Sequence, residues 1–247
     1  FHQVGAGKTL EMIVGVTEMK RMGLISKPAI VVPNHMLEQF SREWLQAYPQ
    51  ARILTASSED LAGEKRRLFI ARAAANDWDG IVFTHSSFER VGVDPESQAA
   101  YLESEMDIVR EAVENARQNG GMTVKQMEKQ LLAEQEKIKK VLDRPRDPGV
   151  TLEASGIDYL AVDEAHLFKN LATVSNIPGA AVEGSGRAND LHLKLQVLRE
   201  RNGGRVGVMA TATPLANSVT EAHIMQRFLR PDLLEEAGVK HFDAWAA

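Results

Sequence analysis

The chain has 247 residues, of which 44% are apolar and 26% are charged, ordinary values for a soluble globular domain. Its net charge of −5 gives no overall positive field, so any contact with nucleic acid must come from local groups. The absence of cysteine excludes disulfides, thiolate zinc sites and cysteine nucleophiles, and it fits a cytoplasmic protein. No apolar run approaches the roughly 18 residues of a membrane span, so we expect no membrane partner.

Short apolar, β-branched runs alternate with amphipathic helical stretches along most of the chain. Strands are predicted at residues 29–33, 52–56, 80–84, 159–163 and 205–210, and helices at about 9–22, 35–48, 60–76, 189–201 and 218–229. This alternation predicts an α/β fold with a mostly parallel sheet and helices on both faces. Residues 179–187 have the composition of a mobile loop.

Residues 95–148 interrupt the alternation with a pattern that is helical throughout. Apolar residues at steps of four and three form a seam that starts at Leu102. The sequence Asn-Gly-Gly at 119–121 predicts a helix stop and a turn, and a second seam runs from Met127 to Leu142. We therefore expect an antiparallel helical hairpin whose seams pack on each other, although its tip could also contact DNA or another domain.

A glycine loop, Val4-Gly5-Ala6-Gly7-Lys8-Thr9, leads into a predicted helix through Leu10. Glycine has no Cβ, so backbone N–H groups can approach phosphate oxygens, and the helix N-terminus adds a partial positive charge. Lys8 would contact the β- and γ-phosphates of a nucleotide, and the Thr9 hydroxyl would ligate Mg²⁺. His2 stands where the G-x-x-x-x-G-K-[ST] pattern has glycine, so a glycine-rich turn with a surface lysine is the alternative.

Asp163 and Glu164 are adjacent carboxylates at the end of an apolar strand. Such a pair is costly to desolvate unless a cation uses it. Asp163 is placed to hold a Mg²⁺ shell through water, and Glu164 could orient and deprotonate an attacking water. The alternative is a solvated acidic turn, which the separate glycine-lysine loop makes less plausible.

Thr211 and Thr213 follow the last predicted strand, in the sequence Thr-Ala-Thr-Pro. Their hydroxyls could bridge the γ-phosphate region of a nucleotide and a mobile neighbour. The alternative is a Thr-Pro sequence that only terminates the strand.

The order and the sequences of these motifs resemble those of the first RecA-like lobe of superfamily 2 helicases, and within that group those of the Swi/Snf-type translocases. Asp163-Glu164-Ala165-His166 matches the DEAH box, and Lys169-Asn170 matches its DEAH-x-x-K-N extension. The segment 211–217 resembles the T-G-T-P-x-x-N motif, with Ala212 in place of glycine. The hairpin before the DEAH box resembles that of large phage and mobile-element proteins that join such a motor to an adenine-specific DNA methyltransferase.

The resemblance implies that residues 1–247 form one RecA-like P-loop lobe of a larger protein, with residues 95–148 inserted into it. ATP and Mg²⁺ are the implied ligands. The nucleotide-binding residues are Val4, Gly5, Ala6, Gly7, Lys8, Thr9 and Leu10, the catalytic residues are Lys8, Asp163 and Glu164, and the metal-binding residues are Thr9 and Asp163. His166, Thr211 and Thr213 would couple hydrolysis to movement, and the strand before the glycine loop is expected upstream of Phe1.

DNA is the implied partner, with RNA not excluded. Contacts to its phosphates are expected from residues after the first and third strands and from the DEAH extension: Pro33, Asn34, Thr84, His85, Ser86, Lys169 and Asn170. For Asn34 and Ser86, helix capping is the competing role. A second RecA-like lobe of the same parent chain, which would supply an arginine finger, and a fused or associated DNA methyltransferase are the other implied partners.

Two other functions stay open at this stage. One is a degenerate lobe that docks DNA or protein without hydrolysing ATP, and the intact Lys8, Thr9, Asp163 and Glu164 argue against it. The other is an unrelated P-loop ATPase or kinase, which Lys169-Asn170 and the Thr-Ala-Thr-Pro sequence disfavour. We therefore expect a nucleic-acid-dependent ATPase of the helicase or translocase kind, in a restriction-modification or phage setting.

Overall fold

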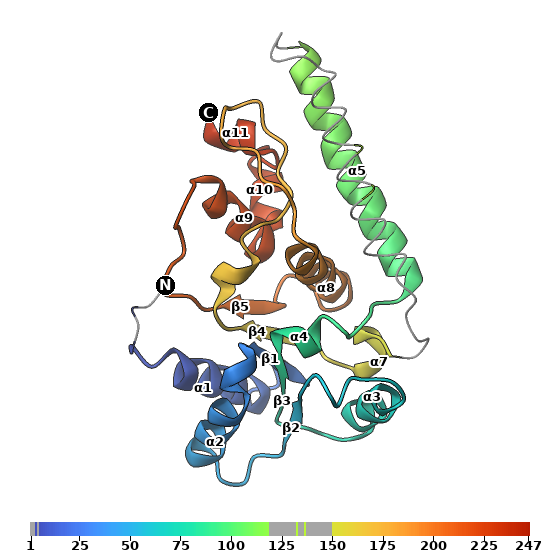
Figure 1. The fold of residues 1–247 in the computed structure, drawn as a ribbon, viewed down its shortest axis with the longest axis vertical. Coiled ribbons are helices and arrows are strands. Elements are labelled where there is room, and N and C mark those ends of the chain that lie inside the picture. The colour runs from blue at the N-terminus through green and yellow to red at the C-terminus, as the bar shows by residue number, and fades with distance from the viewer. Residues whose placement is uncertain (1–2, 4, 119–131, 133–135, 137–149) are drawn as a thin grey trace. The chain divides into compact units, whose positions relative to one another are not determined.

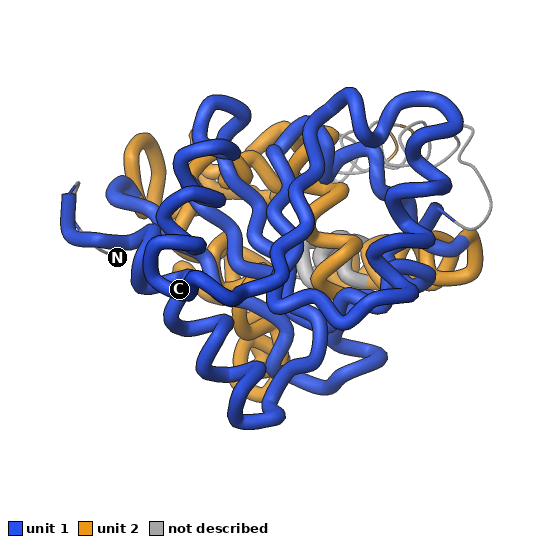
Figure 2. Tube along the Cα trace, turned by 90° about the horizontal axis from the view of Figure 1, so that it is seen from below, with its two compact units in different colours: residues 1–94, 146–165, 197–213 blue, residues 95–145, 166–196, 214–247 orange. Residues whose placement is uncertain are grey.

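The computed structural model describes residue 3 and residues 5–118, 132, 136 and 150–247. The chain divides into two compact units, which Figure 2 distinguishes by colour. Unit 1 consists of Phe1–Asp94, Arg146–Ala165 and Val197–Thr213, and unit 2 consists of Pro95–Pro145, His166–Gln196 and Pro214–Ala247.

Unit 1 is built on a five-stranded sheet with the strand order β2-β3-β1-β4-β5. The strands are β1 (Pro28–Val32), β2 (Ile53–Ala56), β3 (Gly80–Thr84), β4 (Tyr159–Val162) and β5 (Gly207–Met209). Every pairing between them is parallel. The predicted α/β fold with a parallel sheet is thus confirmed.

Helices cover both faces of this sheet (Figure 1). In unit 1 they are α1 (Lys8–Arg21), α2 (Leu37–Ala47) after the 3₁₀ turn η1 (Asn34–Met36), α3 (Lys65–Ala75), α4 (His85–Phe88) and α7 (Leu152–Ser155), while α8 (Gly186–Asn202) runs through both units. Long apolar strands that are buried on both sides, such as β1, are typical of parallel sheets, since helices pack on each face.

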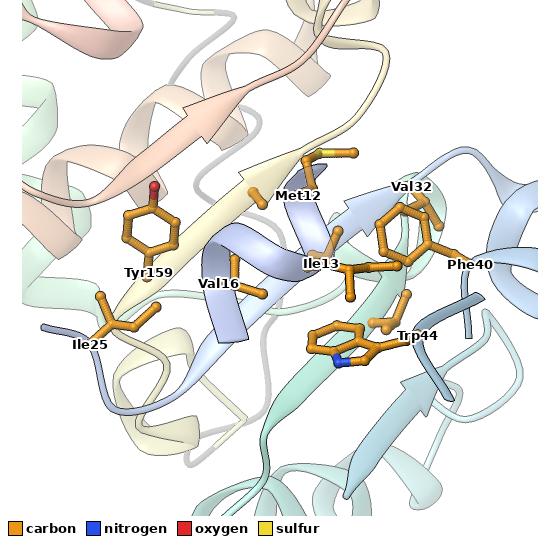
Figure 3. Close-up of a cluster of buried hydrophobic side chains, with 11 residues drawn as sticks. Met12, Ile13, Val16, Ile25, Val32, Phe40, Trp44 and Tyr159 are labelled. Atoms are coloured by element: carbon orange, nitrogen blue, oxygen red, sulfur yellow. The ribbon is translucent and has the colours of Figure 1, made fainter. Parts of the chain in front are cut away.

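The core on one face joins α1 and α2 to the sheet. Ile13 of α1 and Trp44 of α2 are fully buried and belong to one cluster with Ile30, Val82 and Ala161 of three adjacent strands (Figure 3). These three strand residues stand opposite one another in the register, so their side chains share one face. Phe83, the next residue after Val82, points to the other face, where the ring of Phe69 in α3 meets it edge to face at a centroid distance of 5.7 Å.

The start of α3 differs from the prediction. The helix begins at Lys65 rather than near residue 60, because the Asp60 carboxylate accepts hydrogen bonds from the Ser57 backbone N–H at 2.8 Å and from its hydroxyl at 2.6 Å. The hydroxyl contact lowers the pKa of Asp60. A side chain that bonds the local backbone in this way stabilises a turn in competition with the helix.

In the described residues of unit 2, helices are joined by loops, and Thr173 and Val182 form one isolated bridge. The helices are α5 (Pro95–Gln118), α9 (Thr220–Leu229), α10 (Pro231–Glu236), α11 (Phe242–Ala246) and the unit 2 part of α8, and the 3₁₀ turn η2 (Ala165–Phe168) begins at the boundary. The first arm of the predicted hairpin is confirmed as α5. Most of the second arm, with the seam from residue 127 to 142, lies outside the described residues.

Buried polar groups fasten α5 within unit 2. Both oxygens of Glu105 accept from Nη2 of Arg227 in α9, at 3.2 and 2.9 Å, and the Tyr101 hydroxyl lies 2.9 Å from Nδ1 of His192 in α8. Burial would raise the pKa of Glu105, but the Arg227 guanidinium and, to a smaller extent, the nearby His192 imidazole keep it below its ordinary value. The first arm is thus fixed to α8 and α9.

The segment predicted as a mobile loop, residues 179–187, is only partly a loop. Val182 forms an isolated antiparallel bridge with Thr173, and α8 already begins at Gly186. The prediction was wrong for the last two residues, because the helical apolar pattern becomes clear only after them.

His223 of α9 packs against aromatic side chains from the last residues of the sequence. Its ring centroid is 5.7 Å from that of Phe242 and 5.6 Å from that of Trp245. Burial, with a further contribution from the positive charge of Arg227, lowers the pKa of His223 to about 4. The folded state therefore holds this imidazole neutral.

None of the helices in the described ranges has the length and apolar composition needed to cross a bilayer.

The first prediction concerns Gly80, where β3 begins under Trp44. A Cβ at this position would lie 2.0 Å from Cη2 of the indole. We expect Gly80→Ala to lower the free energy of unfolding by roughly 1–3 kcal/mol, the usual cost of overpacking a core. Chemical denaturation would measure this, with Gly204→Ala as the control because a Cβ there meets nothing within 4 Å. Equal stability of the two variants would contradict the packing of Trp44 on β3.

The second prediction concerns the acid lability of unit 2. Below pH 6.5 the unfolded chain protonates His223 while the folded chain does not until about pH 4. Stability should therefore fall as the pH decreases through this window, by up to about 3 kcal/mol, and should be unaffected by this group above it. His223→Leu should remove this part of the pH dependence in denaturation curves, whereas His35→Leu, at an exposed position, should keep it. The same slope in all three proteins would rule out His223 as its source.

Candidate functional site

The glycine loop has the backbone that its sequence predicts. Gly5 and Gly7 have φ values of 81° and 85°, in the left-handed region where residues with a Cβ are strained. The Ala6 N–H and the Lys8 ammonium both donate to the carbonyl of Gln3, at 3.2 and 3.1 Å, which closes the loop. Val4 lies outside the described residues.

Helix α1 starts directly after this loop. Gly7 is its N-cap and, as a glycine, has no side chain to cap the first turn, where backbone N–H groups have no intrahelical acceptor. Thr9 is half-buried and Leu10 is exposed in this turn. An uncapped start of a 14-residue helix after left-handed glycines is suited to binding phosphate.

A cavity of about 290 Å³ places the start of α1 beside the end of β5. Lys8 and Glu11 line it from the helix, and Ala210 and Thr211 line it from the segment after the strand. Thr211 is buried, and its hydroxyl accepts from the N–H of the exposed Thr213 at 3.1 Å. The lysine of the loop and the first threonine of the Thr-Ala-Thr-Pro sequence therefore line one cavity.

The acid pair follows β4 in a strained turn. Asp163 is buried, and its N–H donates to the carbonyl of Val31 at 2.8 Å. Glu164 has φ 50° and is the only non-glycine residue with positive φ in the part of the chain that the structure describes. Such a conformation costs of the order of 1–3 kcal/mol for a residue with a Cβ and is concentrated at functional sites.

Backbone hydrogen bonds join this turn to the end of β5. The Ala210 N–H donates to the carbonyl of Val162 at 2.8 Å, and the Ala165 N–H donates to the carbonyl of Ala210 at 2.9 Å. Ala210 also lines the cavity that contains Lys8. The glycine loop, the acid pair and Thr211 thus lie at the same carboxyl edge of the sheet, where ligands bind in open α/β folds.

The sheet ends at β5 within the described ranges. β5 pairs with β4, and its Val208 is 40% exposed. The outer edge of β5 is therefore open to pairing with a further strand. The strand expected upstream of Phe1 would pair there, and it stays a prediction.

Magnesium is compatible with the side chains at this edge. Thr9 offers a hydroxyl and Asp163 a carboxylate, the hard oxygen donors that Mg²⁺ prefers, and the ion usually keeps several waters and phosphate ligands. Among the described residues no group of three or more histidine, aspartate or glutamate side chains is arranged for a metal.

A cluster of four polar side chains links the ends of β1, β2 and β3. The Ser86 hydroxyl donates to Oδ1 of Asn34 at 3.0 Å and lies 2.7 Å from the hydroxyl of Ser58 and 3.3 Å from that of Thr84. We call these four residues the hydroxyl cluster. Asn34 is exposed and Ser86 is half-buried, whereas Thr84 is buried and caps α4 by accepting from Ser87 N–H at 3.1 Å. Of the residues expected to meet DNA here, Asn34 and Ser86 are the accessible ones.

Pro33 and His85, also expected to contact DNA, are buried. Nε2 of His85 lies 3.0 Å from the carbonyl oxygen of Asp163. His85 therefore connects the end of β3 to the acid pair from inside the sheet edge. No local pattern predicts this contact, because the two residues are 78 positions apart.

The segment that follows the acid pair, from His166 to Asn170, lies in unit 2. His166 is half-buried in η2, and the exposed Asn170 uses its carbonyl to accept from the Ser185 N–H at 2.8 Å. Nζ of Lys169 lies 2.9 Å from Oε1 of Glu221 in α9. Sequence reasoning missed Glu221, which sits ten residues after Thr211 in an ordinary helical pattern.

Comparison with known proteins gives two findings. The whole chain, residues 1–247, matches a protein family described as "Probable helicase domain". The chain is also 33% identical over 86 residues to "Defense against restriction protein B" of Escherichia phage P1. That match spans 32% of this chain and 4% of the phage protein, so the chain corresponds to a small part of that relative.

The third prediction tests the contact between His85 and Asp163. Losing a buried hydrogen bond costs about 1 kcal/mol, and leaving a buried carbonyl without its donor raises the cost to about 1–3 kcal/mol. We expect His85→Leu to lower the free energy of unfolding by that amount in denaturation experiments. His35→Leu, at an exposed position, should be nearly neutral. Two equally small effects would show that the imidazole does not support the acid pair.

Proposed function

Because the chain belongs to the family of probable helicase domains, we propose that it is the ATP-binding and ATP-hydrolysing first RecA-like lobe of a DNA-dependent translocase of the Swi/Snf type. The observation that supports this most is the meeting of the glycine loop, the acid pair and Thr211 at one carboxyl edge of a parallel sheet. An edge of this kind can hold a triphosphate and a water that attacks it.

In this proposal the loop from Gly5 to Gly7 and the start of α1 hold the phosphates. Lys8 would contact the β- and γ-phosphates, and Thr9 and Asp163 would hold Mg²⁺, Asp163 through water. When bound, the ion neutralises charge on the β- and γ-oxygens. Glu164 orients the attacking water and accepts its proton.

The same proposal assigns coupling to residues beside the γ-phosphate. Thr211, Thr213 and His166 would register whether the γ-phosphate is present and pass this state to the segments that follow them. A second RecA-like lobe of the parent protein would close on the nucleotide and contribute an arginine finger, which can be worth about 10³–10⁵ in rate. Closure and release would then move the motor along nucleic acid.

For nucleic acid we propose phosphate contacts, without base reading, at the hydroxyl cluster and at Asn170. Asn34 and Ser86 offer exposed or half-exposed polar groups at the ends of β1 and β3, which suits contacts to a sugar-phosphate backbone. Duplex DNA is the substrate that we propose. His85 belongs to the support of the acid pair in this account, because its ring is buried.

The biological setting that we propose is restriction-modification or a phage or mobile element. The phage relative is named for defence against restriction, and a fused or associated DNA methyltransferase is the partner that this setting favours. A docking module that does not hydrolyse ATP is less favoured, since a strained backbone at Glu164 has a cost that a docking role does not explain.

The fourth prediction tests Glu164 as the general base. In the full-length protein, Glu164→Gln should bind ATP with unchanged affinity and hydrolyse it at least about 100-fold more slowly, the usual contribution of a general base. Glutamine has the same size and the same backbone strain, so only the carboxylate is lost. Steady-state ATPase and equilibrium ATP binding would measure both effects, with Glu38→Gln on the exposed side of α2 as the control. Retained turnover would exclude this role for Glu164.

A further inference from the structure

Glu221, in the first turn of α9, is a buried carboxylate with partners on two separate segments. It is 4% exposed. Its Oε1 lies 2.9 Å from Nζ of Lys169, and its Oε2 accepts from the N–H of Ala216 at 2.7 Å and from that of Asn217 at 3.4 Å. Burial opposes the ionised form, but these N–H donors and the Lys169 ammonium keep the pKa of Glu221 below its ordinary value.

The two segments are the continuations of the two strands that form the site. Lys169 comes three residues after His166, in the extension of the acid pair that ends β4. Ala216 and Asn217 end the Thr211–Asn217 motif that follows β5. One side chain therefore contacts both segments that leave the carboxyl edge next to the proposed γ-phosphate.

Helix α9 holds this carboxylate in place within unit 2. The Thr220 hydroxyl donates to the carbonyl of Ala180 at 3.0 Å, and Nη1 of Arg227 donates to that of Ala172 at 2.9 Å. A carboxylate in the first turn is also favoured by the helix dipole. Glu221 is thus a fixed point, and the two segments are attached to it.

Lys169, the partner of Glu221 in this ion pair, is largely shielded from solvent. Its side chain is 16% exposed and that of Glu221 is 6% exposed, so the attraction between them is screened less than in a surface pair. Moving either segment away from α9 would leave a poorly hydrated charge behind. A lysine whose main role was to meet DNA phosphates would instead present its ammonium to solvent.

We propose that Glu221 is a positioning residue that makes the Lys169 segment and the Ala216–Asn217 segment move together, and that Lys169 serves this link rather than a DNA phosphate. The inference rests on the proposed function, since the motion it transmits is driven by ATP turnover at the acid pair. It replaces the expected DNA contact of Lys169 and leaves Asn170 as the exposed member of that pair.

The test compares four variants of the full-length protein with the unaltered one. Glu221→Gln and Lys169→Met each break the ion pair, and Lys169→Arg conserves it. The double variant Lys169→Met/Glu221→Gln removes both charges, so it leaves no unpaired buried charge and is expected to fold even if a single variant does not. Folding is checked by thermal denaturation in every case.

Three quantities are measured: ATP affinity, stimulation of ATPase by duplex DNA, and the slope of log DNA affinity against log salt concentration. We expect the two single variants and the double variant to keep ATP affinity within about twofold and to lose at least about tenfold in stimulation, with Lys169→Arg close to unaltered. The salt slope should not change, because no phosphate contact is lost. A slope smaller by about one in Lys169→Met would mean that Lys169 binds a phosphate and would overturn the proposal. Full stimulation in the double variant would overturn it as well.

Hydrogen exchange separates failure of the link from failure of the proposed function. The amides of Ala216 and Asn217 should exchange at least about threefold faster in the double variant, since a neutral acceptor bonds them less strongly. Unchanged exchange would show that no such link exists, whatever the ATPase does. Faster exchange in a protein whose turnover DNA never stimulates would refute the proposed function, and the coupling role of Glu221 with it.

Discussion

The pairing of β4 with β5, and the hydrogen bonds that continue it past the strand ends, is the constraint on which the site depends. Ala210 donates to Val162 and accepts from Ala165, so the chain must turn sharply between Val162 and Ala165. Glu164 takes the left-handed backbone that this turn requires. The acid pair is therefore placed at the sheet edge by backbone geometry, and its conformational cost is offset by the parallel sheet beneath it.

Supports from other elements converge on the same turn. In β1, the carbonyl of Val31 accepts a hydrogen bond from the Asp163 N–H. At the end of β3, the His85 imidazole contacts the carbonyl of Asp163. In unit 2 the segment that continues from the acid pair is tied to α9 through Lys169 and Glu221. The sequence motifs assign His85 and Lys169 to DNA contacts. In the structure, however, their polar groups bind other residues of this chain.

The sequence was sufficient for the α/β fold class and for the backbone of the glycine loop, because the patterns that indicate them are local. Buried strands such as β3 are read from continuous apolar runs, and the left-handed glycines of the loop are read from Gly5 and Gly7 themselves. The sequence did not predict the start of α3, where the Asp60 carboxylate accepts from Ser57. Nor did it predict the contacts of His85 and Glu221, which join distant positions in the chain. Those contacts depend on strand order and helix packing, which periodicity does not specify.

In the proposed mechanism, Lys8 and Thr9 share one metal-bound triphosphate with Asp163 and Glu164. A crystal structure of the full-length Glu164→Gln protein with ATP and Mg²⁺ tests it most directly. We expect a single Mg²⁺ between the Thr9 hydroxyl, a water held by Asp163 and the β- and γ-phosphates, with Lys8 on the same phosphates. A nucleotide bound elsewhere, or an ion that touches neither Thr9 nor the water of Asp163, would contradict it.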